Sequence, residues 1–458
     1  MEIRRAYFLG IGGIGMSAIA RYCLQKGIAV AGYDRTASAL TRALEAEGAQ
    51  VSYEDREATI PTEYKDEAGT VVVWTPAIPS DSELIQYFRS KGYRMMKRAE
   101  ALGILTRDSR LVAVSGTHGK TTTSTLAAHI LRTSETGCGA FLGGVSMNYE
   151  TNYWGDATSD VIVTEADEYD RSFHQLTPSA SVITSMDPDH LDIYGTHAGV
   201  IEAFLKFASL TKEGGLVVVR SGLPVGTADV EKGVTVRTYS MTDSAADYRA
   251  ENIRVEDRRY CYDVVTPSGV IKDIRLGLPG RHNIDNSIAA IAVAQWAGAS
   301  DDEIREACRT FRGNQRRFEV KYETERRIVV DDYAHHPKEI ETTLRSIREL
   351  YPGMRLTVAF QPHLYTRTRD LAEGFATSLS IADRVWLIPI YPARELPIEG
   401  VSSEMIARQI AGDKARMTTK ERLASDIVSE DVEVVVVMGA GDIDRLVDGV
   451  AAAVRDKK

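Results

Sequence analysis

The sequence predicts an α/β protein of three domains, each built around a largely parallel β-sheet. Its 458 residues are too many for one hydrophobic core. Apolar strands that lead through a polar or glycine-bearing loop into a helix recur in three stretches, which open near the N-terminus, at Arg110 and at Arg326. These stretches give the predicted domains 1–108, 109–315 and 316–458.

The composition is that of an ordinary globular protein, with 43% apolar and 26% charged residues. Because no run of about 18 or more apolar residues occurs and the N-terminus lacks a signal-peptide pattern, we expect no membrane insertion and a cytoplasmic location. A formal net charge of -10 disfavours nucleic acid as a partner. The four cysteines show no zinc-site or disulfide spacing and are predicted to be reduced.

The first domain carries a glycine loop of the form GxGxxG between a strand at 4–10 and a helix through 18–25, and an acidic residue closes the next strand. Glycine lets the backbone approach a pyrophosphate, and the amides of a helix N-terminus favour its negative charge. The pattern therefore predicts a diphosphate site, and its alternative is a tight turn that only packs helix on strand. The predicted residues are Gly10, Gly12, Gly13, Ile14, Gly15 and Asp34.

The second domain opens with a buried strand and a phosphate-binding loop that ends in Gly-Lys-Thr. Lys120 is expected to reach the terminal phosphates, and the Thr121 hydroxyl to ligate Mg²⁺. The spacing departs from GxxxxGK[ST], because Val114 stands at the first glycine position, and this argues against a GTPase-type switch. The predicted nucleotide-binding residues here are Gly116, Thr117, His118, Gly119, Lys120, Thr121 and Thr122.

Two later strands of this domain end in acidic clusters, EADEYD at 165–170 and DPDH at 187–190. Carboxylate oxygens beside a phosphate loop are the expected ligands of Mg²⁺. We predict Glu165 as the first metal ligand and His190 as a ligand of a second ion. Acidic loops that merely face water are the alternative for either cluster alone.

Between about 215 and 278 the strands show polar alternation, which indicates an antiparallel patch, and a helix follows at 282–298. Asn283 and Asn286 lie near the start of this helix, on one face. Asparagine amides can read an adenine edge, because they both donate and accept hydrogen bonds. Chemistry alone favours a plain helix cap at Asn283.

In the third domain, three segments bring anion-binding groups next to predicted strands: Arg316-Arg317, the stretch 332–337 and the stretch 361–367. An arginine of this set is expected to bind a carboxylate or a γ-phosphate. His335 and His336 are candidates for a near-neutral base, and one of the two is expected to be structural.

The order of these motifs resembles that of the Mur ligases over essentially the whole chain. The strings that carry the resemblance are GIGGIGM, GTHGKTTT, EADEYD, DPDHLD, GRHNIDN, RRFE, DDYAHHP, QPHLYTRT and GAGD. It implies a UDP-sugar-binding Rossmann-like N-terminal domain, a central P-loop ATPase domain with a parallel sheet plus a small antiparallel sheet, and a Rossmann-like C-terminal domain that closes over both and admits the amino acid.

Carried over position by position, the resemblance implies roles for individual residues. Lys120 and Thr121 match the phosphate loop, Glu165 and His190 match the metal ligands, and Asn283 and Asn286 match the adenine-contacting motif. The expected ATP-binding set also includes Arg317. The residues expected in catalysis are Lys120, His335, His336 and Arg367, and the C-terminal residues expected to bind substrate are Tyr333 and His363.

Within the family, GIGGIGM with DDYAHHP and QPHLYTRT is similar to the members that act in peptidoglycan synthesis by joining L-alanine to the lactyl carboxylate of UDP-N-acetylmuramate. The resemblance therefore implies ATP and Mg²⁺ as cofactors, an acyl phosphate intermediate, and UDP-N-acetylmuramate and L-alanine as substrates. The pattern departs from the family at Ser185, Leu364 and the YPARE segment at Tyr391. Lys206 is expected to be an exposed helix residue rather than a carbamylated lysine.

Four alternatives remain open from the sequence. A recycling ligase of the same fold would attach a preformed peptide to the same UDP-sugar, and QPHLYTRT speaks against it. A folate polyglutamylating synthase would not need the N-terminal glycine loop. An NAD-dependent dehydrogenase fits the first domain alone, and a nucleotide-sensing protein would bind ATP without turnover. The sequence leaves the oligomeric state open.

Overall fold

The computed structural model describes residues 3–393 and 395–457, without the side chain of Asp192, and confirms the α/β class with three sheets. The chain divides into two compact units. The first comprises 1–251, 263–274 and 285–311, and the second comprises 252–262, 275–284 and 312–458. Among the described residues, none of the helices combines the length and apolarity needed to cross a membrane.

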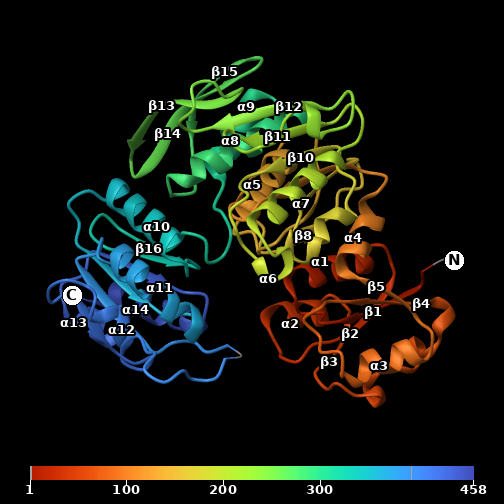
Figure 1. Cartoon of the computed structure of the whole chain (residues 1–458), viewed down its shortest axis with the longest axis horizontal. Coiled ribbons are helices and arrows are strands. Elements are labelled where there is room, and N and C mark those ends of the chain that lie inside the picture. The colour runs from red at the N-terminus through yellow and green to blue at the C-terminus, as the bar shows by residue number, and fades with distance from the viewer. Residues whose placement is uncertain (1–2, 394, 458) are drawn as a thin grey trace. The chain divides into compact units, whose positions relative to one another are not determined.

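The first sheet has five parallel strands in the order β3-β2-β1-β4-β5 (Figure 1). Its strands are β1 (Arg5–Leu9), β2 (Ala29–Tyr33), β3 (Gln50–Ser52), β4 (Thr70–Trp74) and β5 (Arg94–Lys97). The helices beside them are α1 (Ile14–Gln25), α2 (Ala39–Ala46), α3 (Glu83–Ser90) and α4 (Arg98–Thr106). Because β1 is central and ends at the glycine loop, it presents this loop at the carboxyl edge of the sheet, where ligands of open α/β sheets bind.

The second sheet has ten strands in the order β15-β14-β13-β12-β11-β10-β6-β9-β7-β8. Its first strands are β6 (Arg110–Ser115), β7 (Gly139–Phe141), β8 (Tyr153–Trp154), β9 (Val161–Glu165) and β10 (Ala180–Ile183). The neighbours of β6 are β9 and β10, both parallel to it. All three strands are apolar and largely buried, and their carboxyl ends carry the phosphate loop and the two acidic clusters. The helices of this part are α5 (Lys120–Thr133), α6 (Leu191–Tyr194), α7 (His197–Ser209), α8 (His282–Ala297) and α9 (Asp301–Thr310).

The predicted antiparallel patch is narrower than the sequence indicated, and it extends the same sheet. The strands β11 (Leu216–Arg220) and β12 (Thr235–Ser240) pair in parallel with their neighbours. The strands β13 (Tyr248–Glu256), β14 (Arg259–Thr266) and β15 (Gly269–Arg275) follow one another through tight connections and make the hairpins of this sheet.

The third sheet, in the second unit, has the order β16-β17-β21-β18-β19-β20, with only β16 antiparallel. Its strands are β16 (Glu319–Glu323), β17 (Ile328–Asp332), β18 (Leu356–Phe360), β19 (Arg384–Leu387), β20 (Ala415–Met417) and β21 (Val434–Met438). The helices here are α10 (Pro337–Leu350), α11 (Tyr365–Leu379), α12 (Glu404–Ala407), α13 (Leu423–Ser429) and α14 (Val447–Asp456). The histidine-bearing segments 332–337 and 361–367 lie at the carboxyl ends of β17 and β18, respectively.

Candidate active site

The glycine loop and Asp34 lie in contact. Gly10 has a φ of +90°, which favours glycine, and the Gly12 amide donates to Asp34 Oδ2 at 2.9 Å. Gly13 precedes the first residue of α1, Ile14, so the free amides of the helix point at the loop. A Cβ on Gly12 would lie 2.7 Å from Thr41 Cγ2, so the loop requires glycine there.

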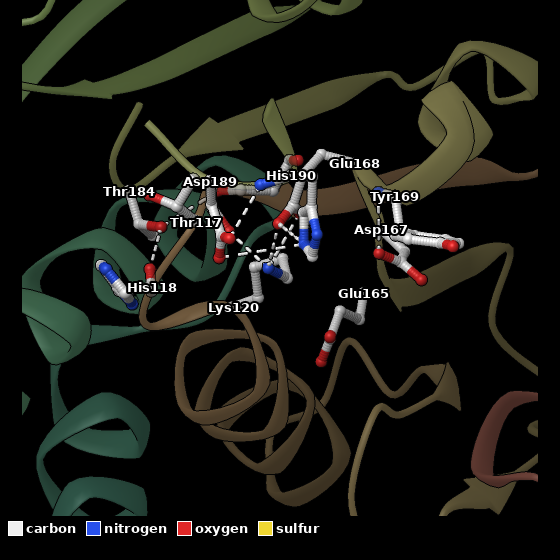
Figure 2. Close-up of polar contacts among 12 residues, drawn as sticks. Thr117, His118, Lys120, Glu165, Asp167, Glu168, Tyr169, Thr184, Asp189 and His190 are labelled. Atoms are coloured by element: carbon white, nitrogen blue, oxygen red, sulfur yellow. Dashed lines mark hydrogen bonds and ion pairs between the residues drawn. The ribbon is translucent and has the colours of Figure 1, made fainter. Parts of the chain in front are cut away.

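The phosphate loop holds Lys120 by its own backbone and by an acidic residue. Lys120 Nζ donates to the Gly116 carbonyl at 2.6 Å and lies 2.8 Å from Glu168 Oε2. Figure 2 shows Lys120 and Glu168 pointing toward one another at the end of the loop, with His190 beside them. Glu168 is 3% exposed, so this ion pair lies largely out of solvent.

The charge on Lys120 is maintained by its surroundings. Burial opposes the charged form, but the carboxylates of Glu168 and Glu165 outweigh it, and the pKa of Lys120 is raised. The ammonium is therefore present at neutral pH and can neutralise a terminal phosphate.

Thr121 and Glu165 form the second link between the phosphate loop and the acidic strand end. The Thr121 hydroxyl donates to Glu165 Oε2 at 2.7 Å. Gly143 lies so close to the Glu165 carboxylate that a side chain would not fit between them. A hydroxyl and a carboxylate oxygen are hard ligands, which fit an ion that takes its other ligands from phosphate and water. Thr122 follows in the first turn of α5, and its side chain is buried.

His190 lies apart from Glu165, as Figure 2 shows. Its Nε2 is 3.9 Å from Glu168 Oε1 and 3.8 Å from Asp189 Oδ2. Within the described part of the chain, no group of three His, Cys, Asp or Glu residues is close enough to hold one ion. Thr121 with Glu165, and His190 separately, therefore stay predicted ligands of Mg²⁺.

Sequence reasoning did not predict the contacts that hold the phosphate loop in place. Ser185 Oγ lies 2.8 Å from Thr117 Oγ1 and accepts from the His118 amide, also at 2.8 Å. The Thr184 hydroxyl bonds the Ser115 carbonyl at 3.1 Å. Ser185, which departs from the family pattern, therefore supports the loop through these two contacts. Glu168 is one of four acidic residues in EADEYD. No feature of the spacing indicates that Glu168, rather than Glu165, pairs with Lys120.

The two asparagines of α8 have different surroundings. Asn286 lies against Gly119, where an added Cβ would stand 2.5 Å from Asn286 Oδ1, so it reaches the phosphate loop. Asn283 Nδ2 donates to the Pro279 carbonyl and is buried. This bond ties Asn283 to the turn before the helix. The adenine contact remains a prediction for both residues.

In the second unit, the ring of Tyr333 has a guanidinium of Arg316 and one of Arg317 near it, at 4.9 Å and 5.1 Å from its centroid. Arg316 also donates to the carbonyl of Gly439, the residue after β21, at 2.6 Å. The Arg317 side chain therefore lies next to a predicted substrate residue. These contacts place the RRFE and DDYAHHP segments side by side.

His335 and His336 have distinct environments. His335 Nδ1 lies 3.0 Å from the Tyr333 carbonyl, which makes Nδ1 the protonated nitrogen and leaves the Nε2 lone pair available. Burial lowers the pKa of His335, which Glu339 opposes, so the imidazole is neutral near pH 7. His336 instead caps α10, with its Nδ1 accepting from the Lys338 amide at 3.3 Å.

His363 stacks on Tyr391, with ring centroids 5.6 Å apart, and lies 6.3 Å from the ring of His335. Burial and the positive charge of Arg367 lower the pKa of His363 to about 4. Leu364 has a φ of +70° and its amide donates to the Tyr391 carbonyl at 2.9 Å. The two departures at Leu364 and Tyr391 are thus in direct contact. Lys206 is exposed near the end of α7, as predicted.

Three family models match the chain. They are described as Mur ligase family, catalytic domain, over 5–110, Mur ligase middle domain over 114–294, and Mur ligase, glutamate ligase domain, over 316–441. Together they cover most of the chain, in the order that the motifs predicted.

Curated relatives match over nearly the full length. The UDP-N-acetylmuramate–L-alanine ligase of Phocaeicola vulgatus is 47% identical over 456 residues, which are 99% of each chain. The protein of the same name from Parabacteroides distasonis is 48% identical, over 98% of this chain and 97% of that protein.

Among solved structures, the UDP-N-acetylmuramate-alanine ligase of Thermotoga maritima superposes with a TM-score of 0.81 at 26% identity, over 99% of this chain and 100% of that one. The murein peptide ligase of Psychrobacter arcticus gives a TM-score of 0.67 at 22% identity, over 99% of each chain, and shows a shared fold alone.

Proposed function

We propose that this chain, which belongs to the Mur ligase family, joins L-alanine to the lactyl carboxylate of UDP-N-acetylmuramate and converts ATP to ADP and phosphate. We choose these substrates because the chain is 47% identical, over 99% of both chains, to a protein named for this reaction. The reaction belongs to peptidoglycan synthesis, and we place it in the cytoplasm, where ATP is available.

A carboxylate and an amine at neutral pH form a salt rather than an amide, so the carboxylate must be activated. In the proposed course, a lactyl carboxylate oxygen attacks the γ-phosphorus, the bond to the β,γ-bridging oxygen breaks, and an acyl phosphate and ADP result. Two anions have to meet in this step. Lys120, which is charged and contacts both Gly116 and Glu168, is our candidate cation for the γ-phosphate.

Thr121 with Glu165, and His190 separately, would hold Mg²⁺ ions, which supply charge neutralisation on the phosphate oxygens. The remaining predicted nucleotide residues of the loop present backbone amides to the phosphates. Ser185 and Thr184 hold these amides in place through their bonds to the loop. The adenine is assigned to Asn283 and Asn286, and Arg317 completes the ATP-binding set.

In the second step the amine of L-alanine attacks the acyl carbon, phosphate leaves, and the amine loses a proton. His335 is our candidate acceptor of this proton, because its Nε2 lone pair is available and its imidazole is neutral near pH 7. His336 is assigned to the helix cap. Arg367, Tyr333 and His363 are assigned to holding the amino acid.

Mass spectrometry of the product tests this proposal. The wild-type chain, incubated with ATP, Mg²⁺, UDP-N-acetylmuramate and L-alanine, is expected to yield the UDP-sugar with one alanine attached. A Lys120→Ala chain run in parallel controls for contaminating ligase. An unmodified UDP-sugar in both samples would contradict the proposal.

A further inference from the structure

Arg98 connects the glycine loop to the acidic loop at the phosphate site. It stands at the first position of α4, and its Nη2 donates to Asp167 Oδ2 at 3.0 Å. Asp167 lies in the sequence between Glu165, the partner of Thr121, and Glu168, the partner of Lys120. These residues all belong to the first compact unit.

The other contact of Arg98 is with Gly15, the last glycine of the loop. A Cβ on Gly15 would lie 2.5 Å from Arg98 Nη1 and 3.0 Å from Arg98 Cδ. The glycine therefore leaves the space that the arginine side chain occupies. The guanidinium therefore lies beside Gly15, which belongs to the first turn of α1.

The guanidinium has capacity for a further anion. It carries five N–H donors, and in the described part of the chain Asp167 accepts the one hydrogen bond it donates. Its side chain is 26% exposed, so it is neither sealed in the core nor fully solvated. A diphosphate offers oxygens that match the fork of an arginine.

We infer that Arg98 binds the diphosphate of the UDP-sugar acceptor, together with the amides of the glycine loop. The inference rests on the proposed function, which puts this diphosphate on that loop. The same arginine neutralises Asp167 on the side of the glycine loop, so an anionic acceptor meets one negative charge fewer near the phosphate site.

Direct binding measured without turnover tests this role. We expect Arg98→Ala to raise the dissociation constant for UDP-N-acetylmuramate about 10- to 100-fold, the range for loss of a charge-assisted hydrogen bond, and to leave the constant for ATP within about twofold. Arg98→Lys should lose less, because it keeps the charge. Lys97→Ala is the matched control, since Lys97 pairs with Asp170 at 2.7 Å between the same two segments but is 48% exposed. It should bind the acceptor like the wild type.

Two further arms separate the explanations. UDP-N-acetylglucosamine shares the diphosphate but lacks the lactyl carboxylate, so Arg98→Ala should weaken its binding by a similar factor. A loss confined to UDP-N-acetylmuramate would overturn the diphosphate assignment. Asp167→Asn removes the link but not the arginine, and an equal loss of acceptor binding in this variant would mean that Arg98 acts only through Asp167, which would overturn direct binding.

Wild-type affinity for UDP-N-acetylmuramate in the Arg98→Ala chain would overturn the role of Arg98 alone. A wild-type chain that binds neither UDP-sugar would overturn the proposed function, and the role of Arg98 with it.

Discussion

Lys120 Nζ and Glu168 Oε2 lie 2.8 Å apart, and the carboxylate is almost fully buried. The lysine of a phosphate loop is expected to contact the nucleotide phosphates, and in this chain it also pairs with a carboxylate that follows a neighbouring strand. The carboxylate raises the pKa of Lys120 and, with the Gly116 carbonyl, holds the ammonium beside the loop.

Lys120→Ala should lower the turnover number by about 1,000-fold or more, because it removes the cation that stabilises the transferring phosphoryl group. It should also destabilise the fold by about 3 to 5 kcal/mol, since it leaves Glu168 buried without its ammonium. Phosphate release and urea unfolding measure the two effects. Lys206→Ala, at an exposed lysine, is the control and should change neither.

Thr121→Val should lower turnover at least about tenfold at limiting Mg²⁺, because it removes the hydroxyl that donates to Glu165 while keeping the side-chain volume. Thr121→Ser retains the hydroxyl and should stay close to wild type. A titration of phosphate release with Mg²⁺ distinguishes them. Identical Mg²⁺ dependence in the valine and serine chains would speak against Thr121 as a ligand.

The pH dependence of amide formation should depend on His335. Burial lowers its pKa from the ordinary value of 6.5, so the imidazole stays neutral at pH 6.5 and above and is lost as a base only as pH falls further. The ratio of wild-type to His335→Ala turnover should therefore be constant above pH 6.5 and should fall toward 1 below that pH. His336→Ala removes a helix cap, worth about 1 kcal/mol, but should keep the wild-type profile. A constant ratio at every pH would exclude His335 as the base.

Asp331 gives a stability prediction with a definite sign. Burial raises its pKa from 3.8 to about 7, which Arg316 partly offsets. The folded chain thus binds this proton more tightly than the unfolded chain, and stability is lost as pH rises from about 4 to 7. The free energy of unfolding of Asp331→Asn, relative to that of the wild type, should therefore increase by about 2 to 3 kcal/mol as the pH rises from 5 to 8. Urea unfolding at each pH measures this difference. Asp448→Asn, at a 91% exposed carboxylate, should show no such gain.

Much of the fold and the site could be predicted from local patterns. The glycine loop, the Gly-Lys-Thr triplet and the apolar strands before them are contiguous in sequence, and the structure puts Gly12 on Asp34 and Lys120 in the loop. The bounds of the hairpin strands do not follow from the pattern, because the predicted antiparallel patch begins at about 215 and so includes β11 and β12, which pair in parallel.

The partners within the site could not be predicted, because they depend on which strands lie side by side. Glu165 and Glu168 lie in one acidic segment, and the sequence does not show which of them contacts Lys120. In the structure Glu165, at the end of β9, accepts from Thr121, and Glu168, in the turn that follows, pairs with Lys120. Arg98 carries no motif at all. Its place beside Gly15 results from the packing of α4 on α1.

The proposed reaction is tested most directly by phosphate release from ATP in the presence of Mg²⁺ and UDP-N-acetylmuramate. L-Alanine, glycine, L-serine and the tripeptide of the recycling reaction are compared one at a time. We expect release that is greatest with L-alanine and that depends on the UDP-sugar. Release with the tripeptide alone, or no release with any of the four, would contradict the proposed reaction.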